Sequence, residues 1–297
     1  MNIIQKIYHL YANNPVAIDF IGQEASDLIK AELEKDKPSM IARLGSTELQ
    51  AIEWYVNSKH PLKKYIEIFK KKVILNKMAV LSGFYPSTEK NIALFSEMML
   101  RDMQEVDILG SWRKEERMFG NELKTAKKIH LKDIEPYYHK HPWSKIIKNK
   151  RVLVIHPFDE SIMIQFKKRN LLFENPDILP EFELVTLKAV QTIAGNKSEF
   201  KDWFEALDFM KNQIDKIDFD IALIGCGAYG FPLAAHIKRK GKKAVHIGGS
   251  LQILFGIKGK RWDTHPIISK FYNENWVKPL NSEIPQQAKR VDGGSYW

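Results

Sequence analysis

The sequence contains a single cysteine, Cys226, among its 297 residues, so no disulfide can form within the chain. It has no apolar run that approaches the ~18 residues of a membrane-spanning helix. Residues 1–9 lack the basic start and long apolar core of a signal peptide. Together these absences lead us to expect a globular protein of the cytoplasm.

Acidic residues are scarce relative to basic ones: 36 Asp and Glu stand against 46 Lys and Arg, a net charge of +10. Much of the excess lies in residues 59–72 and 113–151. Such a balance is typical of proteins that meet nucleic acid, an anionic membrane face or phosphate-bearing substrates, and equally of a lysine-rich solvated surface. No zinc-finger spacing, basic heptad or RNA-binding aromatic strand accompanies the charge, so we expect no nucleic-acid partner.

Short apolar runs alternate with helical patterns along the chain, which predicts an α/β, Rossmann-like fold with a mostly parallel sheet and helices on both faces. Predicted helices include Glu89 to Met103, capped by Ser87, and Glu199 to Ile217. The predicted strands are Met40 to Leu44, Ala79 to Ser82, Val106 to Leu109, Val152 to His156, Leu184 to Leu187, Ile221 to Ile224 and Ala244 to Ile247.

No repeat, low-complexity tract or linker divides the chain, so we expect one domain over residues 1–297. Residues 1–38 form a helical segment in this interpretation. Residues 263–297 form a wrapping tail, whose aromatic side chains indicate that it packs against the domain.

A glycine-rich turn follows the strand at Ile221 to Ile224. Gly225, Gly227 and Gly230 have G-x-G-x-x-G spacing where this strand meets a helix, so backbone N–H groups and the helix N-terminus could face a diphosphate. A dinucleotide site normally has an acidic residue at the end of the next strand, but here that strand ends in His246 with no acid beside it. The pattern therefore favours a nucleotide or phosphate ligand over NAD(P), and close packing alone is the competing explanation.

A second candidate site ends the first predicted strand. Arg43 stands before Gly45, and an arginine that ends an apolar strand needs an anionic partner, for which phosphate is apt. Glu48 follows shortly and could face the same ligand. Helix capping offers a structural explanation for part of this segment, with Ser46 as the N-cap and Glu48 in the first turn near the helix dipole.

Two further segments add polar groups at predicted strand ends. Asp159 or Glu160, after the strand that ends at His156, could act as a general base, although a carboxylate that opens a helix is also ordinary capping. His156 is more typical of a structural histidine than of a catalyst. The last segment has the outline of a diphosphate clamp, or of a solvated basic loop, and comprises Gly248, Ser250, Lys258, Lys260 and Arg261.

The order Arg43-x-Gly45-x-x-Glu48, a middle strand over 150–156, the glycine turn with its helix, and the strand end at His246 resembles the GT-D type glycosyltransferases of bacterial glycosylation clusters. That resemblance implies a Rossmann-like core, a nucleotide-diphosphate sugar donor, and an Arg-Tyr-Gly-Asp-Gly-Glu motif whose Asp-x-Glu pair meets a divalent metal. In this chain Ser46 replaces the motif's aspartate. The family's Asp-Ile-Gly-His segment reads His-Ile-Gly-Gly over 246–249.

The resemblance implies an enzyme of the hexosyltransferase class that transfers a sugar to a surface polysaccharide, lipopolysaccharide or protein-linked glycan, including lipid-linked acceptors. Such an acceptor would place it at the inner face of the membrane, with peripheral association to an anionic surface. Two alternatives stay open: a nucleotide- or phosphate-binding protein of a glycan assembly pathway without transferase activity, and an NAD(P)-dependent oxidoreductase. We expect no required cofactor and weak or absent dependence on Mg²⁺ or Mn²⁺, with Glu48 the metal ligand if there is one.

Overall fold

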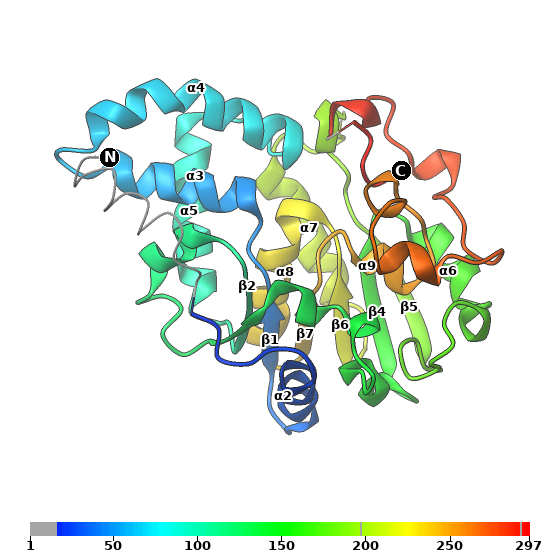
Figure 1. Cartoon of the computed structure of the whole chain (residues 1–297). Coiled ribbons are helices and arrows are strands. Elements are labelled where there is room, and N and C mark those ends of the chain that lie inside the picture. The colour runs from blue at the N-terminus through cyan, green and yellow to red at the C-terminus, as the bar shows by residue number, and fades with distance from the viewer. Residues whose placement is uncertain (1–16, 197, 292) are drawn as a thin grey trace, which may run out of the picture.

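The computed structural model describes residues 17–196, 198–291 and 293–297. All strand pairs in its seven-stranded sheet are parallel, in the order β3-β2-β1-β7-β6-β4-β5 (Figure 1). The strand order reverses between β1 and β7, which is where open α/β sheets bind ligands. The strands are β1 (Ser39–Ala42), β2 (Ile108–Ser111), β3 (Lys127–His130), β4 (Arg151–His156), β5 (Glu183–Lys188), β6 (Ile221–Ile224) and β7 (Lys243–His246).

Helices cover both faces of the sheet, as predicted. Alternate residues of β1 belong to two separate cores: Met40 and Ala42 pack with α3, α4, α5, α7 and α8, whereas Ile41 packs with α2, α6 and α9. The helices are α2 (Gln23–Glu34), α3 (Ser46–Ser58), α4 (Lys64–Leu81), α5 (Glu89–Met103), α6 (Asp159–Phe166), α7 (Trp203–Ile214), α8 (Gly230–Arg239) and α9 (Leu251–Leu254). None of the helices in the described part of the chain has the length and apolar character that crossing a membrane requires.

Two strand predictions differ from the structure. The predicted strand Ala79 to Ser82 is wrong, because these residues are the end of α4 and its C-cap. A short apolar run does not distinguish a buried strand from a helix end. The sequence analysis also missed β3, since only Ile129 of its four residues is buried and its lysines hide the strand pattern.

One predicted helix cap and the bounds of one predicted helix differ from the structure. The N-cap of α5 is Thr88, whose side chain accepts a hydrogen bond from Asn91 N, and not Ser87. Helix α7 is shorter than predicted because Asp202 caps it and accepts from Glu205 N. Helix α2 lies inside the predicted N-terminal helical segment, of which residues 1–16 fall outside the described residues.

The C-terminal segment, residues 263–291 and 293–297, lies across the carboxyl side of the sheet (Figure 1). The indole of Trp276 is buried and donates to the carbonyl of Leu172 at 3.1 Å. The buried carboxylate of Glu283 accepts hydrogen bonds from the backbone N–H groups of Glu160 and Ser161. The segment therefore satisfies donors at the N-terminus of α6 that would otherwise need water.

Candidate functional site

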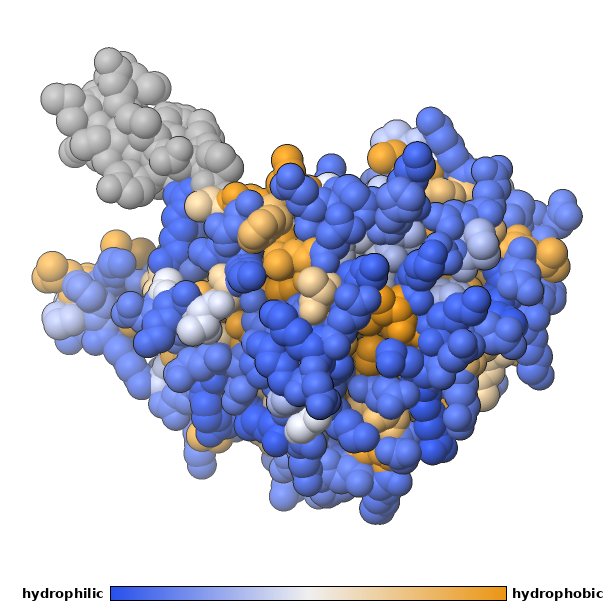
Figure 2. Space-filling view, turned by 90° about the horizontal axis from the view of Figure 1, so that it is seen from below, coloured by the Kyte–Doolittle hydropathy of each residue, from blue (hydrophilic) through white to orange (hydrophobic). Residues whose placement is uncertain are grey.

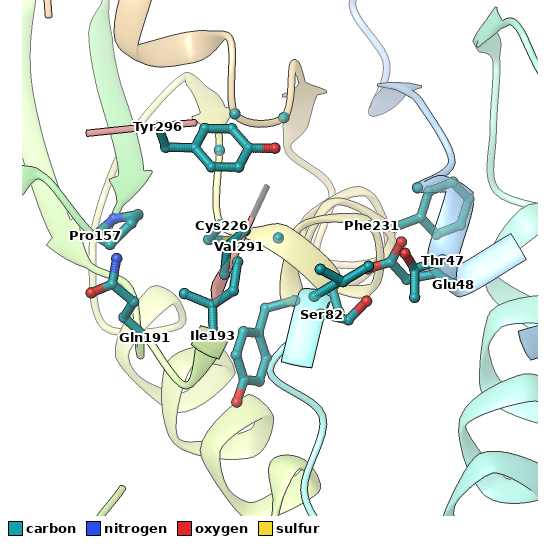
Figure 3. A pocket seen from close by; sticks show the side chains of 18 of the residues that line it. Thr47, Glu48, Ser82, Pro157, Gln191, Ile193, Cys226, Phe231, Val291 and Tyr296 are labelled. Carbon is teal, nitrogen blue, oxygen red and sulfur yellow. The ribbon is translucent and has the colours of Figure 1, made fainter. Parts of the chain in front are cut away.

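A cavity of 340 Å³ lies at the carboxyl ends of β1, β7, β6 and β4, where the strand order reverses. Its volume falls within the range of small-molecule sites. Figure 3 shows Gln191 and Pro157 on one side of this cavity, Thr47 and Glu48 on another, and Tyr296 from the C-terminal segment beside it. Elements that are distant in sequence thus meet at one sheet edge.

Glycine is needed at the three positions after β6 for different physical reasons. A Cβ atom at Gly225 would come within 2.6 Å of the carbonyl oxygen of Gly248, and one at Gly230 would come within 2.3 Å of Nε2 of His246. Both positions therefore need glycine for packing. Gly227 has a φ of +58°, and a Cβ atom added there would meet no other atom within 4 Å, so its backbone is open to the cavity that it lines.

This turn presents a helix start to the cavity. Residues Gly227–Tyr229 form a short 3-10 turn that leads directly into α8, and no side chain caps either element. Because the first N–H groups of a helix have no intrahelical acceptor, they can bind an anion, and the helix dipole favours negative charge there. A phosphate ligand at this glycine turn stays a prediction.

Arg43 is the cation at the end of β1. Its side chain lines the cavity and packs on Trp112, with Cζ 5.2 Å from the ring centroid. Its buried Nε makes no hydrogen bond with a described residue. Burial lowers the pKa of Arg43, while the nearby Tyr296 and Glu48 act in the opposite direction. A buried guanidinium N–H that lacks an acceptor suits an anionic ligand.

Glu135 is a carboxylate near Arg43 that the sequence analysis missed. The negative charge of Glu135 acts to raise the pKa of Arg43, and burial raises the pKa of Glu135 itself. The hydroxyl of Tyr137 donates to this carboxylate, and the side chain of Ser250 also bonds to it. Ser250 is not among the residues that line the cavity, so the structure places it beside Glu135 and not at the predicted ligand position.

Glu48 lines the cavity together with Gly45, Ser46 and Thr47. The N-cap of α3 is Gly45, and not Ser46, so Glu48 occupies the third helical position. Its carboxylate folds back over the cap, because a Cβ atom at Gly45 would lie 1.8 Å from Oε2. Glu48 is the only carboxylate side chain among the described residues that line the cavity.

Asp159 and Glu160 lie outside the set of described residues that line the cavity. They begin α6, and each carboxylate lies 3.7 Å from Nζ of Lys188. The sequence analysis gave helix capping as the alternative to a general base; both carboxylates do lie in the first turn of α6, although no side chain caps the helix by a hydrogen bond, and the contact with Lys188 was not foreseen. Sequence spacing could not separate the two, because both need a carboxylate at a helix start.

The basic loop contributes one of its three predicted cations to the cavity. Arg261 lines it and donates from Nη1 to the hydroxyl of Tyr296 at 3.0 Å, with Cζ 4.5 Å from that ring's centroid. Lys258 instead lies over the ring of Tyr272, and Lys260 approaches the carbonyl of Gly293. Neither lysine is a lining residue.

Two buried histidines also line the cavity. Burial lowers the pKa of His156 to about 3, and burial together with the charge of Arg43 does the same for His246. Nδ1 of His156 accepts a hydrogen bond from Phe158 N at 3.0 Å, which keeps the ring neutral and oriented. These contacts are those of a structural histidine, as the sequence analysis expected, although His156 also lines the cavity.

The donor set does not resemble a two-carboxylate metal site. No group of three or more His, Cys, Asp or Glu side chains is placed to hold a metal ion among the residues described. Glu48 has only hydroxyls, those of Ser46 and Thr47, as neighbouring oxygen donors in its own motif. A divalent ion normally takes one or two carboxylates, so Glu48 is the one candidate ligand at this cavity within the described residues.

No protein-family model matches the chain, and no curated protein matches it significantly. The chain is similar to a solved structure described as "Selenomethionine substituted structure of domain of unknown function 1792". The two are 11% identical, the match covers 90% of this chain and 93% of that one, and the TM-score is 0.44.

Proposed function

We propose that this protein is a glycosyltransferase that transfers a sugar from a nucleotide-diphosphate sugar to a glycan acceptor. The observation that carries the proposal is the buried Nε of Arg43, which has no hydrogen-bond partner in the described part of the chain and lies at a cavity that the glycine turn before α8 also lines. A diphosphate suits this pair of features, because it is dianionic or more and offers several acceptor oxygens. Arg261 supplies a second cation at the same cavity.

The same groups suit the reaction as well as the binding step. When the bond between the sugar's anomeric carbon and the diphosphate oxygen breaks, negative charge grows on the leaving diphosphate. Arg43 and the backbone N–H groups of residues 227–229 would stabilise that charge without reorganising. The acceptor hydroxyl forms the new bond to the anomeric carbon and gives its proton to Glu48, and the nucleoside diphosphate leaves.

A second candidate is a protein that binds a nucleotide or phosphate without transferring a sugar, and it is favoured because Glu48 is the single carboxylate side chain among the described residues that line the cavity. The carboxylate of Glu48 folds over Gly45 at the start of α3, where capping would explain it without catalysis. In that case Arg43 and the glycine turn would keep their roles. Glu48 would then matter for stability alone.

Thermal shifts with UDP, CMP, GDP and NAD(H) separate the candidates, since a ligand at 100 times its dissociation constant adds about 2.7 kcal/mol of stability. We expect a shift with a nucleoside diphosphate and none specific to NAD(H). Release of nucleoside diphosphate from the matching nucleotide sugar then tests transfer. Glu48→Gln should retain the thermal shift and lose turnover, whereas binding with no turnover in the unsubstituted protein would favour the second candidate.

A further inference from the structure

Helix α4 carries large apolar side chains on its outer surface. The face that packs against the protein holds Glu67, Ile74 and Met78. On the other side, spacing of three, four and seven residues places four side chains of α4 on one face, and Leu62 lies in the turn just before the helix. These residues, called here the α4 stripe, with their exposed fractions, are Leu62 (79%), Tyr65 (62%), Ile66 (60%), Phe69 (85%) and Val73 (55%).

Lysines flank the α4 stripe. Residues 59–77 contain seven lysines and one acidic residue, Glu67. That carboxylate is buried and paired with Lys70 at 2.9 Å, so it leaves little negative charge on the surface. At 3.6 residues per turn, Lys72 falls on one side of the stripe, and Lys70 and Lys77 fall on the other. Three of the seven lysines pair with acidic side chains, Lys59 with Glu97, Lys70 with Glu67 and Lys71 with Glu89. The other four lysines leave the outer surface of α4 both apolar and positively charged.

We infer that α4 binds the surface of an anionic phospholipid bilayer, with the helix lying in the plane of the interface. An apolar stripe between rows of lysines is the pattern of interfacial helices, whose apolar face enters the lipid while the cations meet anionic headgroups. The positive charge favours this partner over a second copy of the chain, which would bring the same lysines into contact.

Figure 2 shows the side of the molecule that faces away from α4. That side, which carries α2, shows mainly hydrophilic residues with hydrophobic ones in separate small patches. Contiguous exposed apolar surface on a soluble domain usually marks an interaction site. Among the described residues, α4 carries more exposed large hydrophobic side chains than any other helix.

The position of α4 connects this surface to the cavity. Leu81 ends α4, and both Leu81 and the following Ser82 line the cavity. Docking through the stripe would therefore bring the cavity close to the bilayer, within the length of one helix of about 27 Å. This inference concerns a surface outside the cavity and does not depend on the proposed function.

Co-sedimentation of the full chain with vesicles tests it, using phosphatidylcholine with and without phosphatidylglycerol. We expect binding only when phosphatidylglycerol is present, and weaker binding at higher salt. Phe69→Ser should lower the affinity about tenfold. Leu171→Ser removes another exposed apolar side chain, 56% exposed, on a different element and should leave the affinity unchanged.

The charge contribution has its own pair of variants. Lys70→Gln with Lys72→Gln should weaken vesicle binding at least about tenfold. Lys148→Gln with Lys216→Gln, at exposed positions before β4 and β6, should change it much less. Circular dichroism checks that each variant is folded.

Absence of binding to phosphatidylglycerol vesicles would overturn the inference, as would equal binding by folded Phe69→Ser. Sedimentation velocity tests the alternative that a second copy of the chain binds the α4 stripe. A dimer that dissociates in Phe69→Ser, with no vesicle binding by the unsubstituted chain, would make the stripe an interface between copies.

Discussion

The guanidinium of Arg43 lies against the backbone of Gly248: a Cβ atom at Gly248 would be 3.2 Å from Nη1 and 3.1 Å from Cδ. The two residues follow β1 and β7, which pair directly through Met40 and Ala244. Gly248 also has a φ of +84°, a conformation that favours glycine. Adjacent strand ends at the point of order reversal therefore position the cation of the candidate site.

Arg43→Ala should weaken binding of a nucleoside diphosphate more than binding of the nucleoside. Loss of a charge-assisted hydrogen bond costs about 1.5–3 kcal/mol, and only the diphosphate makes that bond. Isothermal titration with UDP and uridine, or with the matching pair for the preferred base, measures the difference.

Arg101→Ala, an exposed arginine near the end of α5, is the control and should leave both affinities unchanged. Equal weakening of the diphosphate and the nucleoside by Arg43→Ala would identify Arg43 as a structural residue. Its packing on Trp112 would then be its main contribution.

Gly227→Asn should abolish nucleotide binding while the protein stays folded. Asparagine tolerates a positive φ better than most residues, and no atom within 4 Å blocks a Cβ there, so the side chain would extend into the space proposed for the phosphates. Thermal unfolding and nucleotide titration measure the two effects separately.

The matched control is Gly241→Asn, at a glycine beyond the other end of α8 that also has positive φ and open space around a Cβ. Both variants should lose similar stability, and only Gly227→Asn should lose binding. Unchanged nucleotide affinity in folded Gly227→Asn would exclude the glycine turn from the site.

The parallel sheet was predictable from the sequence because its buried strands are short apolar runs with turn residues on each side. β6 matches the prediction residue for residue, and β4 and β7 match within one residue at each end. β3 could not be predicted because it exposes its lysines, and the end of α4 reads equally well as a strand. Where periodicity carried the signal, as in α5, the helix bounds agree.

The candidate site was predictable only where a motif marks a strand end. Arg43, Glu48, Gly225 and Gly227 do line one cavity, because parallel strands end at one edge, whereas Gly230 is not a lining residue and packs against His246. Glu135 and Tyr296 could not be predicted, since each reaches Arg43 through tertiary packing of segments without a motif. Lys258, Lys260, Asp159 and Glu160 had the expected chemistry, yet local contacts hold them elsewhere.

Acid should destabilise the protein in part through His156. Its folded pKa of about 3 lies below the ordinary unfolded value of about 6.5, so the unfolded state binds more protons between these values. The stability that the neutral ring supplies is complete above pH 6.5 and falls as the pH drops toward 3, by up to about 1.4 kcal/mol per pH unit.

His156→Asn keeps an acceptor near the N–H of Phe158 and removes the titration. We expect it to be less stable at neutral pH, but to show a shallower loss of stability on acidification. Urea unfolding from pH 7 to about pH 4 gives both slopes. Identical slopes would mean that His156 is not held neutral in the folded state.

Metal removal should have little effect on nucleotide binding. A divalent ion would bind weakly with Glu48 as its one carboxylate ligand, and Arg43 and Arg261 already supply positive charge at the same cavity. Titration with and without EDTA checks this. Loss of binding on chelation, restored by Mn²⁺ and reproduced by Glu48→Gln, would show that a metal is required.

The most direct measurement is a crystal structure of the protein with the nucleoside diphosphate that gives the largest thermal shift. We expect the diphosphate in the cavity at the carboxyl ends of β1, β6 and β7, with an oxygen accepting from Nε of Arg43 and others from the backbone N–H groups of residues 227–229. A diphosphate bound away from Arg43 and the glycine turn, for example at Lys258 and Lys260, would contradict it.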